Sequence, residues 1–348
     1  MSSTKTQLEK VSIIGSGNWG SAIAKIIGTN TMRHLDHFEP IVRQWVFEEQ
    51  IKGRNLTEII NEEHENVKYL KGVKLPHNII AIPDLVTACQ DATLVVFVVP
   101  HQFIHGVCER MKGHLAPGAR AISLIKGLEI TPEGTRLFSE EIARSLNIPC
   151  AALSGANIAN EVAMEKFCES TIGCEDIEQG LIFKRLFDTP YFRINVIQDP
   201  IGVQLCGALK NVVAVGAGFS DGLGHGSNTK AAIIRLGLME MRKFGQTFFG
   251  ESVQTETFFE SCGAADLITT CNGGRNRKVA EAFVLTRKPI ELLEAELLNG
   301  QKLQGTLTAQ EVNQFLKARN MEHEFPLFST VYRIVYEGLS PEAIVIDI

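Results

Sequence analysis

Short runs of apolar residues recur along the first two hundred residues, separated by segments in which apolar positions have helical spacing. A strand covered on both faces has no polar face, so a run such as L-V-V-F-V-V (94–99) is typical of a buried parallel strand. Intervening stretches such as Glu133–Leu146 and Glu178–Phe187 have the amphipathic spacing of helices that cover a sheet. The pattern predicts seven strands: Val11–Ile14, Gln44–Phe47, Ile79–Ile82, Ala92–Val99, Arg120–Leu124, Cys150–Leu153 and Phe192–Val196.

The pattern changes near residues 199–200, and helical periodicity dominates from Ile201 onward. Glycine-rich stretches at 216–226 and 271–277 interrupt it, and we interpret them as turns. Alternating strands and helices with right-handed crossovers form a doubly wound parallel sheet. The chain is therefore predicted to be an α/β protein with two domains: an N-terminal Rossmann-like domain over residues 1–198 and a C-terminal, mainly α-helical domain over residues 199–348.

The first apolar run ends in three glycines with the spacing G-x-G-x-x-G, at Gly15, Gly17 and Gly20. Gly15 permits a tight turn, Gly17 has no side chain to keep phosphates away, and Gly20 lets the following helix pack closely on the strand. The helix contributes unpaired N–H groups and the positive end of its dipole. Between a predicted strand and a predicted helix, this motif predicts dinucleotide binding.

The second predicted strand is followed by Glu48 and Glu49, at the point where an acidic residue usually binds the ribose hydroxyls. They lie further from the glycines than the usual spacing of about 20 residues, so we expect an inserted segment around residues 34–40. Two carboxylates would repel a 2′-phosphate, which favours NAD over NADP. A solvated acidic turn is the alternative for either glutamate. Phe47 either covers the adenine or packs in the core.

Ligands of doubly wound sheets bind at the carboxyl ends of the strands, and three more such ends carry candidates. V-V-P-H-Q-F places Phe103 beside the cofactor, and its His101 is either a proton carrier or a turn histidine bonded to backbone. S-L-I-K-G places Lys126 at the sheet edge, where a surface turn lysine is the alternative. S-G-A-N-I-A-N-E either brings Ala159 near the nicotinamide or simply begins a helix.

The segment L-C-G-A-L-K-N-V-V-A-V-G-A-G (205–218) is an apolar helix interrupted by Lys210 and Asn211. An ionised lysine in such surroundings is unfavourable unless it has a partner or a ligand. Reduction of a carbonyl by hydride needs a cation or an acid beside the developing alkoxide, and a positioned lysine meets that need. Lys210 is therefore predicted to be catalytic. The alternative is a buried ion pair with a carboxylate.

The segment D-L-I-T-T-C-N-G-G-R-N-R combines hydroxyls, glycines and arginines in a way that suits an oxyanion such as phosphate. Arg275 would bind it bidentately, while Thr and Asn side chains orient the remaining oxygens. A basic surface turn is the alternative for Arg275, and more strongly for Arg277. N-G-Q-K-L-Q-G (299–305) places Lys302 and Gln304 in a glycine-bounded loop that can fold over the cofactor.

Composition narrows the class of protein. The 348 residues are enough for about two domains. The net charge of −6 gives no general attraction to nucleic acid or anionic membranes, so an anionic substrate needs local positive groups. No apolar run approaches the roughly 20 residues of a membrane span.

Eight scattered cysteines, without a C-x-x-C pair or a close Cys/His cluster, predict buried free thiols rather than disulfides or a metal site. The chain starts without the apolar core of a secretory signal and ends without S-K-L, so a soluble cytoplasmic protein is expected.

Taken together, these segments resemble the eukaryotic cytosolic NAD-dependent glycerol-3-phosphate dehydrogenases. Matching stretches include G-S-G-N-W-G-S-A-I-A-K, F-V-V-P-H-Q-F, C-G-A-L-K-N-V-V-A-V-G-A-G-F and D-L-I-T-T-C-N-G-G-R-N-R-K-V-A-E-A-F. The resemblance implies reversible hydride transfer between NADH and dihydroxyacetone phosphate, giving sn-glycerol 3-phosphate, a glycerophospholipid precursor whose formation also affects cytosolic redox balance. It further implies a homodimer without metal.

The motif match also implies residue roles. Lys210 would donate the proton to the carbonyl, with four further catalytic residues: Lys126, Asn211, Asp266 and Thr270. The substrate would contact Lys126, Arg275 and Asn276. The cofactor would be lined by Gly15, Ser16, Gly17, Asn18, Trp19, Gly20, Phe47, Phe103, Lys126, Ala159, Arg275, Lys302 and Gln304. Three positions differ from the residues usual in the family, none of them a proposed catalytic group: Ser227, Asn272 and Thr306.

Two other functions are compatible with parts of the pattern. Another two-domain dehydrogenase, acting on a hydroxy acid, would use the same cofactor domain but would not need the R-N-R segment for phosphate. A non-catalytic NADH-sensing protein would be expected to lose Lys126, Lys210 or Asn211, and all three are present.

Overall fold

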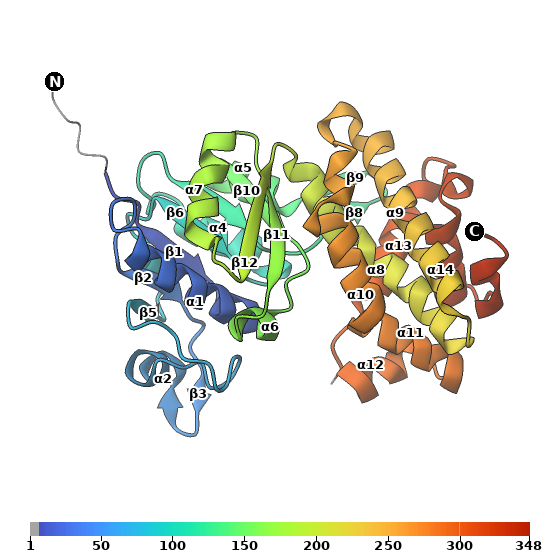
Figure 1. Cartoon of the computed structure of the whole chain (residues 1–348), viewed down its shortest axis with the longest axis horizontal. Helices are drawn as coiled ribbons and strands as arrows, with labels where there is room; N and C mark the ends of the chain where they lie inside the picture. The colour runs from blue at the N-terminus through green and yellow to red at the C-terminus, as the bar shows by residue number, and fades with distance from the viewer. Residues whose placement is uncertain (1–6, 299) are drawn as a thin grey trace. The chain divides into compact units, whose positions relative to one another are not determined.

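The computed structural model describes residues 7–298 and 300–348. The chain forms two compact units (Figure 1). Unit 1 comprises the described residues of Met1–Ile125 together with Phe138–Leu153 and Asn157–Pro200. Unit 2 comprises Lys126–Leu137, Ser154–Ala156 and Ile201–Ile348. Asn299, the first residue of the predicted glycine-bounded loop, lies outside the described residues. Residues 1–6, which belong to the segment in which no secretory signal was expected, lie outside them too.

Unit 1 is built on an eight-stranded sheet with the order β12-β11-β10-β7-β6-β1-β2-β5. β1 pairs in parallel with β2 and β6, β2 with β5, β6 with β7, β7 with β10, and β11 with β12. The predicted doubly wound parallel sheet is therefore confirmed. The strands are β1 (Val11–Ile14), β2 (Val42–Trp45), β5 (Ile79–Ile82), β6 (Leu94–Phe97), β7 (Arg120–Ser123), β10 (Cys150–Ser154), β11 (Cys168–Gly173) and β12 (Phe192–Ile197).

Helices cover both faces of this sheet, as the buried strands require. One apolar cluster joins one face to α1 (Asn18–Arg33), α6 (Ala159–Ala163) and α7 (Ile177–Phe187). Another joins the opposite face to α3 (Leu85–Cys89), α4 (Ile104–Met111) and α5 (Phe138–Leu146). A smaller cluster holds α2 (Leu56–Glu63) against β5, beside the short hairpin of β3 (Gln50–Ile51) and β4 (Arg54–Asn55).

Two elements of the first half differ from the prediction. The start of the predicted helix Glu133–Leu146 is instead β9 (Gly134–Leu137), which pairs antiparallel with β8 (Leu128–Thr131). β11 has no counterpart among the predicted strands. Its polar residues Ser170 and Thr171 are both fully buried, and the Ser170 hydroxyl accepts a hydrogen bond from Asn157 at 2.7 Å. Because two of its buried positions are hydroxyls and Ile172 is its only buried large apolar side chain, the strand lacks the continuous apolar run that identified the others.

Unit 2 is mainly helical, as predicted, and its long apolar helix is α8 (Pro200–Gly222) (Figure 1). Its other α-helices are α9 (Ser227–Phe249), α10 (Asp266–Gly273), α11 (Arg275–Thr286), α12 (Ile290–Leu298), α13 (Gln304–Lys317) and α14 (Pro326–Tyr336). Short helical turns lie at Gly250–Ser252, Glu256–Phe259, Ser261–Ala265, Glu322–Glu324 and Pro341–Val345, and one in unit 1 lies at His101–Phe103.

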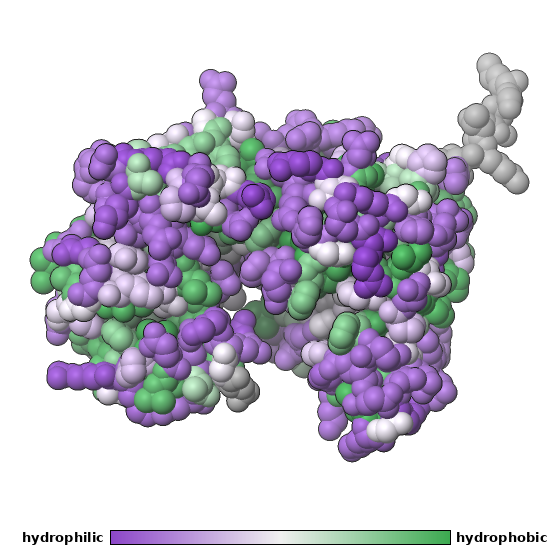
Figure 2. Space-filling model, turned by 180° about the vertical axis from the view of Figure 1, so that it is seen from behind, coloured by the Kyte–Doolittle hydropathy of each residue, from purple (hydrophilic) through white to green (hydrophobic). Residues whose placement is uncertain are grey.

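The expectation that no apolar run approaches a membrane span is wrong for α8. Over the described residues, α8 is long and apolar enough to cross a membrane by length and composition, with a mean hydropathy of 1.4 over its most apolar window. That window is 89 % buried inside the protein, which is the property of a core helix. The apolar character of α8 is therefore used in packing, whereas hydrophilic residues occupy much of the surface in Figure 2.

Both predicted glycine-rich turns in unit 2 are shorter than expected: within 216–226 only residues 223–226 form a turn, between α8 and α9, and the rest is helical. α8 continues through Gly218 and Gly222, where an added Cβ would lie 2.3 Å from the Arg277 carbonyl oxygen and 2.6 Å from the Val284 Cβ, respectively. These glycines permit close packing of α8 on α11 rather than a turn. In the stretch 271–277, only Gly274 has extended backbone, between the end of α10 and the start of α11.

The third glycine of the G-x-G-x-x-G motif supplies a test of the fold. A Cβ on Gly20 would lie 2.7 Å from the Gly15 carbonyl oxygen, so Gly20→Ala is expected to lower the free energy of unfolding by about 1–3 kcal/mol. Gly106→Ala is the matched control, because Gly106 is also the third residue of its helix and an added Cβ meets nothing within 4 Å. There the better helix propensity of alanine should stabilise the protein by up to about 1 kcal/mol. Urea unfolding followed by circular dichroism measures both, and equal shifts in the two variants would contradict this packing.

Candidate active site

The glycine turn lies at the switch point of the sheet. β1 is flanked by β2 and β6, so the winding of the chain reverses there, where doubly wound sheets bind their ligands. Gly15 has a φ of +121°, and an added Cβ would lie 3.0 Å from the Val98 carbonyl group, so no other residue fits. At Gly17 an added Cβ meets nothing within 4 Å, which leaves the backbone open to a ligand.

The next two residues of the motif use their side chains within unit 1. Asn18 donates from Nδ2 to the Tyr69 carbonyl oxygen at 2.7 Å and to Asn160 Oδ1 at 2.8 Å. The ring of Trp19 packs edge-on against Phe192, and Trp19 shares an apolar cluster with Ala159. These two side chains therefore fix the start of α1, and only their backbone N–H groups remain to face an anion.

Aromatic side chains stand exposed beyond the ends of β2 and β6. Phe47 is 70 % exposed and Phe103 is 54 % exposed, so neither is a core residue. Both follow strands that flank the switch point, where a planar ring would find an apolar surface. His101 is exposed and its ring stacks on Phe138, with ring centroids 5.3 Å apart, so both alternatives for it stay predictions.

The two glutamates after β2 already have partners inside unit 1. Glu48 accepts hydrogen bonds from the backbone N–H and the hydroxyl of Thr57. Glu49 accepts one from the Tyr69 hydroxyl at 2.7 Å and forms an ion pair with Lys68. The hydrogen bond from Lys68, followed by that from Tyr69, lowers the pKa of Glu49. Glu49 is thus an anion whose charge is partly balanced by a neighbouring lysine.

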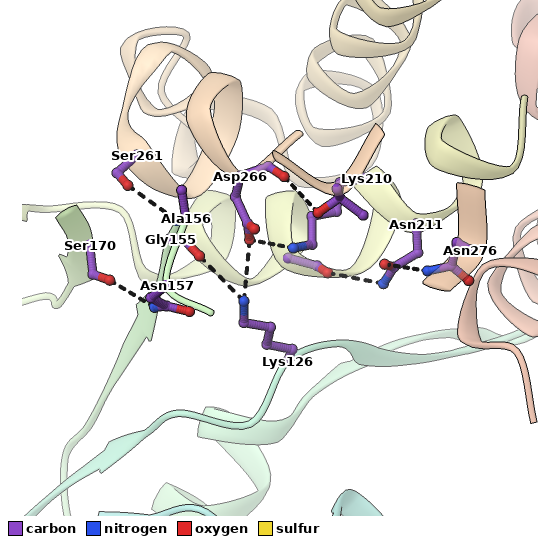
Figure 3. A network of polar contacts seen from close by, with 12 residues as sticks. Lys126, Gly155, Ala156, Asn157, Ser170, Lys210, Asn211, Ser261, Asp266 and Asn276 are labelled. Carbon is purple, nitrogen blue, oxygen red and sulfur yellow. Dashed lines mark hydrogen bonds and ion pairs between the residues drawn. The ribbon is translucent and has the colours of Figure 1, made fainter. Parts of the chain in front are cut away.

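In unit 2 one buried carboxylate holds two ammonium groups (Figure 3). Asp266 Oδ2 lies 2.5 Å from Lys210 Nζ and 3.4 Å from Lys126 Nζ. The side chains of Lys210 and Asp266 are 6 % and 5 % exposed, whereas that of Lys126 is 36 % exposed. Lys126 also donates to the Gly155 carbonyl oxygen at 3.3 Å. The structure therefore brings together three of the predicted catalytic residues, from segments far apart in the sequence.

Two positive charges beside one negative charge change the acidity of the buried amine. Desolvation by burial, followed by the charge of Lys126, lowers the pKa of Lys210 to about 8, although Asp266 acts in the opposite direction. An amine with such a pKa exchanges its proton near neutral pH, which is the property required of a general acid or base. The structure shows the buried ion pair that the sequence presented as one alternative, and this pair leaves Lys210 with the acidity that the catalytic alternative needs.

The remaining predicted polar residues extend this cluster along α8 and α10. The Thr270 hydroxyl donates to the Asp266 carbonyl oxygen at 2.6 Å, so it stabilises the first turn of α10. Asn211, next to Lys210, accepts a hydrogen bond from Asn276 Nδ2 at 2.9 Å. Asn276 in turn accepts from the Gly305 N–H at 2.9 Å, which ties α8, α11 and the start of α13 together.

The two arginines of R-N-R have different environments. Arg275 is the first residue of α11, is exposed, and donates to Gln301 Oε1 at 2.9 Å. Arg277 pairs with Asp221 at 3.1 Å and with Glu281 at 2.8 Å, so its charge is satisfied within the protein. Arg275 is therefore the arginine available to an anion, next to the N–H groups of a helix start.

The predicted loop around Lys302 and Gln304 is shorter than expected. Gln304 is the first residue of α13, which corrects its assignment to a loop. Lys302 pairs with Glu294 at 3.0 Å, and the Leu303 N–H donates to the same carboxylate at 2.8 Å. The sequence did not identify Glu294, because I-E-L-L-E-A-E-L-L contains three glutamates without a sign of which one is buried.

The predicted free thiols can be located as well. All eight cysteines are free, six of them are buried, and Cys150 and Cys168 are partly buried. Over the part of the chain that the structure describes, no group of three or more His, Cys, Asp or Glu side chains is placed to hold a metal ion.

The shared carboxylate can be tested by stability. Asp266→Asn leaves two ammonium groups without their counter-ion, so we expect the free energy of unfolding at pH 7 to fall by about 3–5 kcal/mol. Glu281→Gln is the control, since it removes a more exposed ion pair to Arg277 and should cost less than about 1 kcal/mol. Urea denaturation measures both changes. Similar small changes in the two variants would show that Asp266 is not the counter-ion of a buried charge.

Comparison with known proteins agrees with this geometry. Residues 10–180 match the family model of the NAD-dependent glycerol-3-phosphate dehydrogenase N-terminus, and residues 199–346 match that of the C-terminus. The cytoplasmic NAD(+) glycerol-3-phosphate dehydrogenases of Rattus norvegicus and Homo sapiens are each 61 % identical over 330 residues, which is 95 % of this chain and 94 % of theirs.

Solved structures are similar over nearly the whole chain. The glycerol-3-phosphate dehydrogenase of Saccharomyces cerevisiae has a TM-score of 0.94 at 47 % identity, covering 97 % of this chain and 98 % of that one. The Plasmodium falciparum enzyme has a TM-score of 0.93 at 46 % identity, covering 98 % and 95 %. The chain therefore belongs to the NAD-dependent glycerol-3-phosphate dehydrogenase family.

Proposed function

We propose that this protein is a cytoplasmic NAD-dependent glycerol-3-phosphate dehydrogenase, an oxidoreductase that interconverts dihydroxyacetone phosphate and sn-glycerol 3-phosphate. The observation that carries the proposal is the buried Lys210 amine, whose pKa is lowered to about 8 by burial and the neighbouring Lys126 while Asp266 holds it in place. The names of the relatives from Rattus norvegicus and Homo sapiens support the substrate, the cofactor and the cytoplasmic location.

The glycine turn fits a dinucleotide. Its backbone is open at Gly17, and the N-terminus of α1 supplies N–H groups and a positive dipole end to the pyrophosphate. The exposed rings of Phe47 and Phe103 would contact the adenosine, and Ala159, Lys302 and Gln304 complete the proposed cofactor contacts. When bound, the nicotinamide supplies or accepts the hydride.

In the reducing direction the Lys210 ammonium donates its proton to the carbonyl oxygen of dihydroxyacetone phosphate as the hydride reaches the carbon. Lys126 stabilises the same developing negative charge as a second cation. Asp266 keeps both amines in place, and Asn211 offers an amide to the substrate beside Lys210. In the oxidising direction the neutral Lys210 amine accepts the hydroxyl proton.

The substrate phosphate is assigned to the start of α11. Arg275 supplies a bidentate cation, Asn276 an amide, and the first turn of the helix its N–H groups. The phosphate is remote from the reacting carbon, so its binding energy orients the carbonyl without taking part in bond changes. Residues 1–198 form the cofactor domain and residues 199–348 the substrate domain of this proposal.

Three finer assignments complete the proposal. The chain acts as a homodimer, its product is a precursor of glycerophospholipids, and its turnover links carbohydrate metabolism to the NADH/NAD balance. The sequence differences Ser227, Asn272 and Thr306 leave the reaction unchanged. Asn272 and Ser227 are exposed, and the buried Thr306 hydroxyl donates to the Leu303 carbonyl oxygen at 2.9 Å.

The pH dependence of turnover tests the role of Lys210. Reduction requires the ammonium, so kcat/KM for dihydroxyacetone phosphate should fall as the pH rises through about 8, the pKa of Lys210 in the free protein. Oxidation requires the neutral amine, so kcat/KM for glycerol 3-phosphate should rise through the same range. Nicotinamide absorbance at 340 nm follows both directions.

Two variants complete this experiment. Lys210→Met, which keeps the length of the side chain without its charge, should lower kcat by at least about 10³-fold and leave NADH affinity unchanged. Lys230→Met is the control, because Lys230 pairs with Asp221 elsewhere in unit 2 and should retain both kcat and its pH profile. Near-normal turnover in Lys210→Met, or pH profiles without a step near 8, would reject the assignment.

A further inference from the structure

Two consecutive peptide carbonyls of the glycine turn are held by buried carboxamide side chains. Gln44, on β2, donates from Nε2 to the Gly15 carbonyl oxygen at 2.9 Å. Asn66, in the segment after α2, donates from Nδ2 to the Ser16 carbonyl oxygen at 2.8 Å and to the Ser21 hydroxyl at 2.9 Å. Gln44 is 0 % exposed and Asn66 is 1 % exposed. Neither side chain is therefore accessible to a ligand bound at the turn.

These contacts also determine the direction of two N–H groups. In a planar trans peptide the C=O and N–H bonds point to opposite sides, and the described residues contain no cis peptide bond. Holding the Gly15 oxygen thus orients the Ser16 N–H, and holding the Ser16 oxygen orients the Gly17 N–H. Both N–H groups are directed away from the two carboxamides, and the backbone at Gly17 is open.

The Asn66 side chain is itself held in place. Its Oδ1 accepts a hydrogen bond from the Tyr69 N–H at 3.1 Å, while the Tyr69 carbonyl oxygen accepts one from Asn18 at the start of α1. The Ser21 hydroxyl donates to the Ser16 carbonyl oxygen at 3.2 Å, so that oxygen has two donors. The direction of the Ser16–Gly17 peptide is therefore fixed by contacts from two separate segments of unit 1.

We propose that Gln44 and Asn66 are positioning residues, which set the Ser16 and Gly17 N–H groups in the direction of the cofactor pyrophosphate before it binds. The inference rests on the proposed function, because it takes NADH to be the ligand of this turn. Successive backbone N–H groups that point the same way form a concave site for an anion. When they are already oriented, binding does not have to restrict the rotation of these peptides, and affinity increases.

NADH binding by single variants tests the proposal. Asn66→Ala removes one of the two donors to the Ser16 oxygen, and Gln44→Met removes the carboxamide that holds the Gly15 oxygen and, at 3.3 Å, the Gly20 oxygen. We expect each change to raise the Kd for NADH about tenfold, measured by NADH fluorescence. The catalytic residues lie in unit 2 and are unchanged, so kcat at saturating NADH and substrate should stay within about twofold of wild type. A fall in kcat with an unchanged Kd would overturn the proposal.

Asn78→Ala is the matched control for a merely structural loss. Asn78 is also a buried asparagine that braces α1, but it donates to the Gly28 carbonyl oxygen and the Thr31 hydroxyl, each at 3.0 Å, near the far end of the helix. It should lower Tm as much as Asn66→Ala and leave the Kd for NADH unchanged. An equal rise of Kd in Asn66→Ala and Asn78→Ala, or a wild-type Kd in Asn66→Ala, would contradict the inference.

Two further outcomes also test the proposal: a variant that does not fold, and a wild-type protein that binds no NADH. If Asn66→Ala does not fold, Asn66→Ser and Gln44→Met carry the same comparison with Asn78→Ala, and a wild-type Kd in both would overturn the inference. If the wild-type protein itself binds no NADH, the proposed function fails. That outcome is distinct from normal wild-type binding that the variants do not alter, which rejects the role of Gln44 and Asn66 alone.

Discussion

The proposed chemistry of unit 2 depends on one buried carboxylate that pairs with two amines, of which the Lys210 amine is buried and the Lys126 amine is partly exposed. Burying an ammonium group is costly, and the cost is acceptable only when a counter-ion is fixed next to it. Asp266 is that counter-ion for Lys210, and it is shared with Lys126. Because one negative charge faces two positive ones, Lys210 remains bound in place and yet its pKa is lowered to about 8 by burial and by Lys126.

Unit 1 has to present backbone N–H groups to a dinucleotide at the switch point of the sheet. A backbone without side chains around it can rotate, so the direction of these N–H groups has to be fixed by other contacts. Gly15 and Gly20 bring the turn against the sheet, where larger residues would clash. The buried side chains of Gln44 and Asn66 then hold the turn's carbonyls inward. In the proposed function, the backbone rather than any charged side chain presents the donors for the pyrophosphate.

Much of the fold follows from the sequence, because apolar runs and glycine spacing are local signals. All seven predicted strands begin and end within about two residues of the observed bounds. Lys210 could be identified as a candidate because it interrupts an apolar helix. Gly218 and Gly222 misled the prediction, since glycine serves close helix packing as well as turns. β11 was missed because the buried hydroxyls of Ser170 and Thr171 interrupt its apolar pattern.

The contacts that make the site specific are not local. Lys126 and Asp266 are separated by 140 positions, and Asn66 and Ser16 by 50. A single sequence identifies candidate groups at such positions but not their partners. For Lys210 the structure shows the ion pair with Asp266, and its catalytic role is part of the proposed function. Likewise, nothing near Arg275 and Arg277 in the sequence indicates that only Arg277 has carboxylate partners.

The most direct measurement of this account is the titration of lysine side chains by heteronuclear NMR in the free protein. One lysine should titrate with a midpoint near pH 8, and its signal should be absent from Lys210→Met. If no lysine titrates near pH 8, and the signal lost in Lys210→Met titrates at the ordinary lysine pKa of about 10.4, the Lys210 amine is not desolvated beside a second cation, and the proposed chemistry of the site is wrong.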